Sequence, residues 1–266
     1  MKLVPDFEKM IELRQAVKCK GDFITNFFTE EAKIINWIRS KQFYFLATEE
    51  GVLFLKKNHS FYHLYFYTSS LTKLHGLVKN HLPTEFIVVD IPGKEVTTKQ
   101  HVDLFINAGF KLHTQLQRYI RINANKNNTF QACEEITLAT TEDAELINSM
   151  FEKNFDPISE QVPTLIEVNE MIQNKKVLFI KNNDKIKGFL VRTFIGQTTI
   201  LNHFLVDENF RGEKIGSKLL KHYLFESKNI KRMLLWVIID NARAINMYLK
   251  HGFMKEDMVD YILINK

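Results

Sequence analysis

The stretch from Leu205 to Leu220 has the residue types of an anion-binding turn. It reads LVDENFRGEKIGSKLL, in which an apolar strand end is followed by a turn that contains Gly212 and by helical spacing from Ile215, with Gly216 in the first helical turn. Backbone N–H groups at such a helix N-terminus point into one space, and together with the helix dipole they favour a pyrophosphate. Gly212 and Gly216 let the backbone approach the phosphates without an intervening Cβ. Taken alone, the stretch is explained better by an ordinary strand-to-helix turn with a glycine cap.

A second segment, NARAINMYLKHGF, begins at Asn241 directly after an apolar strand. Asn241, Ala244 and Tyr248 fall at i, i+3 and i+7, so they share one face of a helix. A polar cap, a small residue and a phenol in line fit an extended ligand lying along that face. Singly, Asn241 is explained as an N-cap and Tyr248 as a core tyrosine. The two segments together favour a ligand site over these structural interpretations.

The apolar patterns of the second half predict a mixed α/β sheet with one strand–helix–strand crossover. Strands are predicted at 135–139, 177–181, 188–194, 198–206, 233–239 and 258–264, and helices at 141–154, 163–172, 215–226 and 242–250. Thr141 is the predicted N-cap of its helix, and 182–185 is a predicted hairpin turn. The run at 233–239 is continuously apolar, as in a strand buried on both faces.

The front half follows a similar plan, which favours a tandem duplication. Its helices are predicted at 29–40, 70–80 and 99–107, and its strands at 43–48, 52–56, 62–67 and 85–90. LFINAGF at 104–110 followed by YIRI parallels MYLKHGF at 247–253 followed by YILI, with one inserted residue. The polar stretch 123–129 is a linker candidate. We therefore expect two domains, 1–125 and 131–266.

On these motifs, residues 131–266 resemble a GCN5-related N-acetyltransferase (GNAT) domain. Arg211 to Ser217 is similar to the family's pyrophosphate loop, Arg/Gln-x-x-Gly-x-Gly/Ala, and the segment 241–253 is similar to its second motif. Lys214 stands where the first glycine of that loop usually is. The resemblance implies the acyl-CoA N-acyltransferase fold, a central mixed sheet flanked by helices, in two tandem copies. It also implies acetyl-CoA as co-substrate and no metal.

The resemblance also implies roles for individual residues. The pyrophosphate would be held by Arg211, Gly212, Glu213, Lys214, Ile215, Gly216 and Ser217. Leu205 and Val206 would pair with the pantetheine arm like an added strand, Asn241 would hydrogen-bond that arm, and Tyr248 would lie by the sulfur as the catalytic acid.

By the same comparison, the front half is a degenerate copy without cofactor. At the place of the loop it reads YTSSLTKLHG (67–76), with no arginine and one late glycine. Phe105 stands in place of Tyr248 and has no proton to give.

The implied reaction is acyl transfer from a thioester to an amine. The oxyanion needs a preorganised donor, which the family takes from a backbone N–H of its fourth strand, here near 204–206. A thiol pKa near ~8.5 and a tyrosine pKa of about 10 let Tyr248 protonate the departing thiolate with a small thermodynamic penalty.

The sequence identifies no general base. The strand positions where family members carry a His or Glu base fall on Ile200 and Asn202, which cannot take a proton. Strand alternation places the neighbouring His203 on the opposite sheet face, where we expect a packed or hydrogen-bonded histidine. A water chain or a weakly basic acceptor would then replace the base.

Composition limits the class of protein. No apolar run approaches the ~20 residues of a membrane span, and the amino terminus lacks the apolar core of a secretory signal. Cys19 and Cys133 are too few for a disulfide framework or a thiolate zinc site. We therefore expect a soluble cytoplasmic protein, and no pattern indicates its oligomeric state.

Charge bears on the partners. Residues 1–130 hold 18 Lys and Arg against 12 Asp and Glu, and these basic residues are scattered rather than clustered, which disfavours a nucleic-acid partner.

Three functions stay open. The favoured one is an N-acetyltransferase for a small primary amine. The second is an acyl-CoA-binding regulatory protein without turnover, which the missing base suggests. The third is a tRNA-dependent aminoacyl transferase, which the basic front half would suit and the pyrophosphate loop disfavours. No motif identifies the acceptor.

Overall fold

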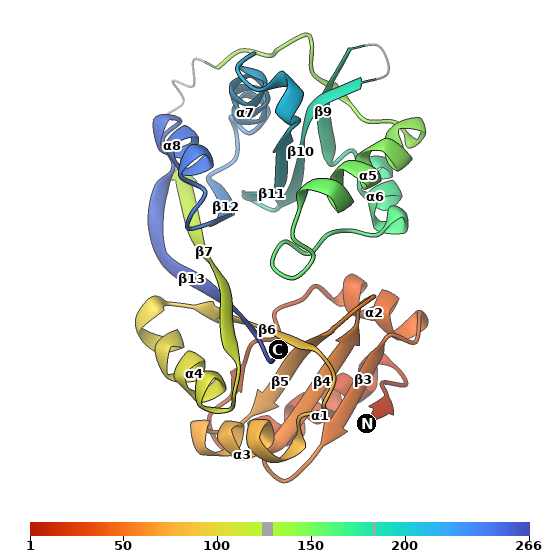
Figure 1. The fold of residues 1–266 in the computed structure, drawn as a ribbon, viewed down its shortest axis with the longest axis vertical. Helices are drawn as coiled ribbons and strands as arrows, with labels where there is room; N and C mark the ends of the chain where they lie inside the picture. Colours follow the sequence, from red (N-terminus) through yellow and green to blue (C-terminus); the bar gives the residue numbers. More distant parts are fainter. Residues whose placement is uncertain (124–129, 183–184) are drawn as a thin grey trace. The chain divides into compact units, whose positions relative to one another are not determined.

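The computed structural model describes residues 1–123, 130–182 and 185–266. The chain forms two compact units (Figure 1), of which the first comprises Met1–Gln115 with Met258–Lys266 and the second Leu116–Asp257. This division differs from the predicted seam at 123–129, of which 124–129 lies outside the described residues. None of the helices found in the described ranges is long and apolar enough to cross a membrane.

The first unit is built on a sheet in the order β1-β3-β4-β5-β6-β13, with β2 beside β5. Its helices bury two apolar clusters: α3 and α4 pack on one, and α1 and α2 on the other. Its elements are β1 (Lys2–Leu3), α1 (Phe7–Lys18), β2 (Ile24–Thr25), α2 (Glu31–Arg39), β3 (Phe43–Ala47), β4 (Gly51–Lys57), β5 (Tyr62–Thr68), α3 (Leu71–His81), β6 (Ile87–Gly93) and α4 (Glu95–Asn107), followed by β7 (Lys111–Ile122).

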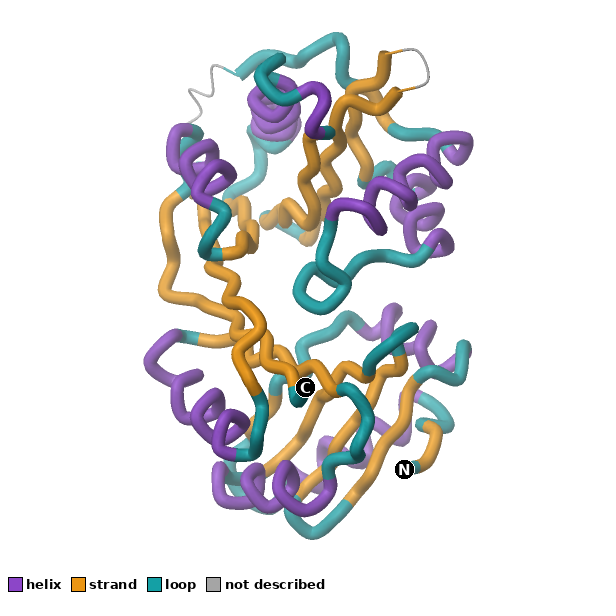
Figure 2. Tube along the Cα trace, viewed as in Figure 1, coloured by secondary structure: helices purple, strands orange, loops and turns teal. Residues whose placement is uncertain are grey.

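The second unit has the strand order β7-β12-β11-β10-β9-β8, with α5 and α6 packed on one face and α7 and α8 on the other (Figure 2). Its elements are β8 (Thr137–Leu138), a 3₁₀ turn (Thr141–Asp143), α5 (Ala144–Asn154), α6 (Leu165–Gln173), β9 (Val177–Asn182), β10 (Lys185–Ile195), β11 (Thr198–Val206), a 3₁₀ turn (Glu208–Phe210), α7 (Ile215–Glu226), β12 (Arg232–Ile238), α8 (Ala242–Lys250) and β13 (Met254–Ile264).

The two units repeat one order of elements. In the first, β3, β4 and β5 are antiparallel, α3 leads to β6, and β6 is parallel to β5. In the second, β9, β10 and β11 are antiparallel, α7 leads to β12, and β12 is parallel to β11. The predicted α/β fold class, a mixed sheet flanked by helices, is confirmed.

The last strand of each half is exchanged between the units, which the sequence analysis did not predict. β7 pairs with β12, from Leu116 opposite Ile238 to Ile122 opposite Arg232. β13 begins in the second unit, where Nε2 of Gln117 donates to the carbonyl of Glu256 (2.6 Å), and then pairs with β6 of the first unit.

The predicted elements next to the motifs are accurate, and other bounds differ by a few residues, as in β10 and β13, which start at Lys185 and Met254 rather than at 188 and 258. The strand at 198–206 and the helices at 215–226 and 242–250 have the predicted bounds. The helix predicted from 141 is capped by Thr140 rather than Thr141, because the Asp143 carboxylate accepts from both the N–H and the hydroxyl of Thr140. The helix predicted from 163 starts at Leu165, after Thr164 as cap. α1 was missed, and 183–184 of the predicted turn lies outside the described residues.

Candidate active site

A gap opens between the parallel strands β11 and β12. β11 pairs with β10 along its whole length, from Thr198 to Val206, but with β12 only as far as Leu201. Within the described part of the chain, the backbone edge of residues 202–206 that faces away from β10 has no strand beside it. An unpaired strand edge exposes N–H and C=O groups that an extended ligand can use.

A β-bulge lies at the point where β11 leaves β12. Val191 of β10 lies opposite His203, and the next residue, Arg192, lies opposite Leu201, so Asn202 is an extra residue in β11. Asn202 Oδ1 accepts a hydrogen bond from Thr193 Oγ1 (2.8 Å), which holds the bulge to β10.

The bulge corrects one expectation about the sheet faces. Val191 and Thr193 lie on one side of β10, and their partners are His203 and Ile200. His203 and Ile200 therefore share a face, and the prediction that they lie on opposite faces is wrong. Simple alternation fails because the extra residue shifts the phase of the strand by one.

The expectation that His203 is packed and hydrogen-bonded is confirmed. Its ring lies edge-to-face against Phe151 and Phe155, with centroids 4.9 and 5.5 Å away. Its Nε2 lies 3.0 Å from the carbonyl oxygen of Glu160. The imidazole thus ties β11 to the loop between α5 and α6.

That loop holds an acidic pair that the sequence analysis did not single out. The Glu160 carboxylate accepts the backbone N–H of Asp156 (2.9 Å). Burial, and after it the nearby Asp156 charge, raises the pKa of Glu160. No local motif marks these residues, since two acids four apart are common on protein surfaces.

The predicted pyrophosphate loop leads into α7 through two residues with positive φ. Gly212 has φ +97°, and Lys214 has φ +60° in the left-handed region. Left-handed backbone costs a non-glycine residue roughly 1 to 2 kcal/mol, which explains why a glycine suits position 214. Arg211 is exposed, and Glu213 pairs with Lys187 (2.8 Å).

The N-terminus of α7 leaves backbone donors available. The N–H groups of Ile215, Gly216 and Ser217 start the helix and have no partner inside it. No other group in the described ranges accepts from them, and Lys214 makes no side-chain cap. The resulting N–H cluster suits an anion.

Gly188 sets how closely α7 approaches the strands, and Gly216 lies at the same junction. A Cβ on Gly188 of β10 would lie 2.7 Å from the Leu205 carbonyl oxygen and 3.1 Å from Cγ2 of Ile215, so only glycine fits there. A Cβ on Gly216 would lie 3.4 Å from Val206 and 3.5 Å from Met247. Gly216 therefore sits where β11, α7 and α8 meet, next to the predicted residue Val206.

α8 carries the other two predicted residues. The side chain of Asn241 accepts the N–H of Ala244 (3.1 Å), so Asn241 caps the helix, as its structural interpretation proposed. Tyr248 is 5% exposed, and its ring lies 5.8 Å from that of Phe253. Burial raises the pKa of Tyr248, so the phenol stays protonated but gives up its proton less readily than an exposed tyrosine. The penalty for protonating a thiolate is therefore larger than expected from the ordinary pKa.

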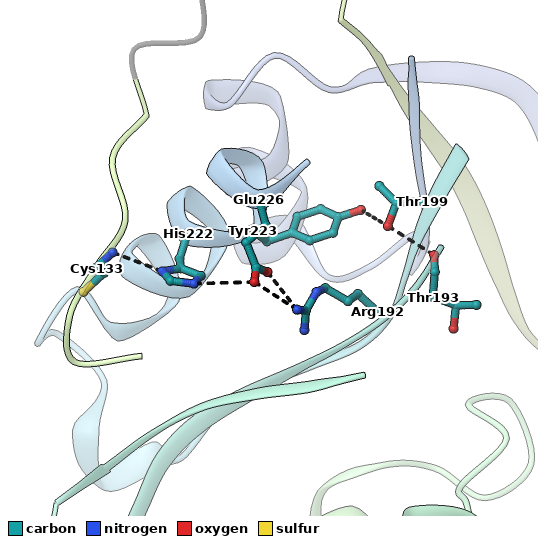
Figure 3. A network of polar contacts seen from close by, with 7 residues as sticks. All are labelled: Cys133, Arg192, Thr193, Thr199, His222, Tyr223 and Glu226. Carbon is teal, nitrogen blue, oxygen red and sulfur yellow. Dashed lines mark hydrogen bonds and ion pairs between the residues drawn. The ribbon is translucent and has the colours of Figure 1, made fainter. Parts of the chain in front are cut away.

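A partly buried polar network fixes the second half of α7 (Figure 3). It joins seven residues: Cys133, Arg192, Thr193, Thr199, His222, Tyr223 and Glu226. Arg192 Nη2 pairs with Glu226 Oε2 at 2.9 Å, and the Tyr223 hydroxyl contacts Thr199 Oγ1 at 3.4 Å. These contacts tie α7 to β10 and β11.

His222 joins the segment before β8 to this network. Its Nδ1 accepts the backbone N–H of Cys133 (3.0 Å), and its Nε2 lies 3.9 Å from Glu226. Burial is the main cause that lowers the pKa of His222. The neutral imidazole is therefore the form that holds the segment.

The structure thus brings together an unpaired strand edge, a free helix N-terminus and a buried phenol. Leu205, Val206, Gly216 and Tyr248 border this region, and Asn241 lies at the start of the same helix as Tyr248. In the described ranges, no three or more His, Cys, Asp or Glu side chains are grouped to hold a metal ion.

The fold is that of the acyl-CoA N-acyltransferases, and the comparisons agree. Residues 133–253 match the model of the acetyltransferase (GNAT) family. A stretch of 64 residues is 33% identical to the spermine/spermidine N(1)-acetyltransferase of Bacillus subtilis (strain 168). It spans 23% of this chain and 42% of that relative, less than half of its length.

Solved structures share the fold over nearly the whole chain. A tandem GNAT protein from the clavulanic acid biosynthesis pathway has a TM-score of 0.59 at 10% identity, covering 97% of this chain and 93% of that one. A GNAT-family acetyltransferase from Colwellia psychrerythraea has a TM-score of 0.57 at 12% identity, covering 99% and 98%.

Proposed function

We propose that this protein transfers an acetyl group from acetyl-CoA to a primary amine of a small acceptor. The observation that carries this proposal is the unpaired edge of β11 beside the free N-terminus of α7. The N–H groups of residues 215–217 and the exposed Arg211 and Lys214 would hold the pyrophosphate. The pantetheine arm would lie along Leu205 and Val206, with Asn241 donating to it.

The reaction would proceed by direct attack. The amine nitrogen bonds to the thioester carbonyl carbon, the oxyanion accepts a backbone N–H near 204–206, and the C–S bond breaks. The Tyr248 phenol would give its proton to the departing thiolate. Its raised pKa makes this transfer less favourable than it would be from an exposed tyrosine.

Loss of the amine proton is assigned to water. An alkylamine with a pKa near ~10.4 is mostly protonated at neutral pH. Ile200 and Asn202 cannot take the proton, and Nε2 of His203 contacts a carbonyl. That neither Ile200 nor Asn202 can take a proton also favours the alternative function, a protein that binds acyl-CoA without turnover.

The acceptor class and the domain roles belong to the proposal. The name of the B. subtilis relative supports a small amine as acceptor. Residues 131–266 would form the catalytic domain, and residues 1–125 a degenerate copy without a cofactor loop. The equal order of elements in the two units supports this second assignment.

The test is release of free thiol from acetyl-CoA with a panel of polyamines, amino acids and aminoglycosides. Amine-dependent release is expected, with a calorimetric stoichiometry near one coenzyme A per chain. Coenzyme A binding without release for any amine would support the alternative function. Two equivalent sites would refute the degenerate copy.

A further inference from the structure

The first unit contains the same strand gap as the second. β5 pairs with β4 along its whole length, from Tyr62 to Thr68, but with β6 only as far as Leu64. β5 and β6 thus part after Leu64, as β11 and β12 part after Leu201.

In the first unit this gap is filled by the chain itself. Ile24 and Thr25 of β2 pair antiparallel with Thr68 and Tyr67 of β5. The opposite edge of these two residues is taken by β4. β2 therefore lies on the edge of β5 that β6 has left.

The next residue, Asn26, bridges the two parted strands. Its Nδ2 donates to the carbonyls of Leu64 and Asp90, both at 2.9 Å, and its Oδ1 accepts the N–H of Phe66 at 3.0 Å. Asn26 is 6% exposed, so these bonds are shielded from water. One amide group thus satisfies backbone groups of both β5 and β6, as an amide of an extended ligand would.

Neighbouring residues hold this segment in place. The Phe27 N–H donates to Thr25 Oγ1 (2.9 Å), which turns the chain at Asn26. The Phe27 ring stacks on Tyr65 with centroids 4.4 Å apart and also contacts Phe43 and Phe54. Its burial anchors the segment in the aromatic core of the first unit.

The N-terminus of α3 also differs from that of α7. The Ser70 side chain accepts the N–H of Lys73 (3.2 Å), and Lys73 Nζ donates to Ser69 Oγ (3.0 Å). The N–H of Lys73 is thus bonded within the first unit, whereas the corresponding N–H in the first turn of α7 would face the phosphates.

We propose that residues 24–27 are a built-in occupant of the first unit's strand gap, standing where the second unit receives the pantetheine arm. The comparison with pantetheine rests on the proposed function; the occupation itself does not. The segment closes the first unit to acyl-CoA and supplies the hydrogen bonds that hold its parted strands.

Amide hydrogen exchange on the full chain tests the occupation. In Asn26→Ala, the lost bonds leave Phe66 N–H unpaired, so its exchange is expected to speed up by about tenfold or more. Asn107→Ala, at an exposed asparagine of the same unit, is the matched control and should leave β5 unchanged. Unchanged exchange at Phe66 in Asn26→Ala would overturn the proposal.

A second measurement uses the wild-type chain and does not depend on a variant that folds. Saturating coenzyme A is expected to protect amides around 203–217 and to leave those of 64–68 unchanged. Protection at 64–68 would show that the gap is open and overturn the proposal. Absence of any protection would instead refute the proposed function, while the Asn26 result would stand by itself.

Discussion

The ring of Phe204 on β11 lies with its centroid 6.5 Å from that of Tyr248 on α8. β12 leads directly into α8, so this contact joins the two sides of the strand gap two residues past the bulge. A buried phenol is thus held next to the strand edge on which the proposed thioester would lie.

Replacing Tyr248 with Phe keeps the ring and removes the proton donor. If the phenol protonates the thiolate, turnover should fall by roughly 10- to 10⁴-fold, with coenzyme A affinity little changed. Steady-state turnover with any accepted amine, beside calorimetry, measures both. Tyr223→Phe is the matched control, because Tyr223 is a buried tyrosine of the same cluster with its hydroxyl on Thr199. If Tyr248→Phe is as active as Tyr223→Phe, the Tyr248 phenol does not protonate the thiolate.

Two substitutions of Gly216 distinguish the effect of charge from the effect of size at the proposed pyrophosphate site. Gly216→Asp should abolish coenzyme A binding, because a carboxylate would face the phosphates at the helix N-terminus. Gly216→Ala should retain binding, since its Cβ would meet Val206 and Met247 at 3.4 and 3.5 Å, ordinary contact distances. Calorimetry compares the two affinities. Normal affinity in a folded Gly216→Asp chain would mean that the phosphates bind elsewhere.

Lys214 has left-handed backbone, so glycine there should stabilise the second unit. We expect Lys214→Gly to raise the free energy of unfolding by about 1 kcal/mol, after the greater entropy of glycine in the unfolded chain is deducted. Lys214→Ala removes the charge but keeps the strained backbone, and should give no gain. Urea unfolding of both variants is the measurement, and an equal gain in both would assign the effect to charge.

His222 should make stability depend on pH. Because its pKa is lowered in the folded chain, the unfolded chain takes up the proton first as the pH falls below about 6.5. The free energy of unfolding should therefore decline from that pH until the lowered pKa has been passed. His222→Gln keeps an acceptor for the Cys133 N–H and does not titrate. We expect the fall in urea midpoint between about pH 7.5 and about pH 5 to be smaller in this variant; an equal fall would contradict the assignment.

Removing residues 258–266 should damage the first unit rather than the second. The deletion uncovers the edge of β6, where Val88 and Val89 are fully buried. Faster amide exchange is expected in β5 and β6, with β10 and β11 unchanged. Deleting Met1–Leu3 removes only the short exposed strand β1 and serves as the control. If the amides of β5 and β6 exchange as slowly in the shorter chain as in the full chain, residues 258–266 are dispensable for the first unit.

The sequence predicted what local patterns determine. The strand at 198–206 and the helices at 215–226 and 242–250 are bounded by turn residues and have clear apolar periodicity, and their bounds were correct. The bulge at Asn202 depends on pairing with β10, which no local pattern records. α1 was missed although Asp6 caps it by accepting the N–H of Lys9, a signal that was available.

The remaining differences come from contacts between distant parts of the chain. Asn26 bonds to residues 38, 40 and 64 positions away, and a single asparagine after Ile24 and Thr25 carries no sign of this. Apolar periodicity also does not predict the exchange of β7 and β13, because the pattern of each strand fits both sheets.

The strand exchange also orders events during synthesis. Ile87 N–H donates to Asn265 Oδ1 (2.8 Å) across 178 positions of the chain, and β6 lacks its β13 neighbour until residues 259–264 have been made. The first unit to leave the ribosome is therefore the last to complete its sheet. The second unit contains all of its strands once residue 257 has emerged. The second unit can therefore fold before the first unit completes its sheet, which reverses the usual order from the amino terminus.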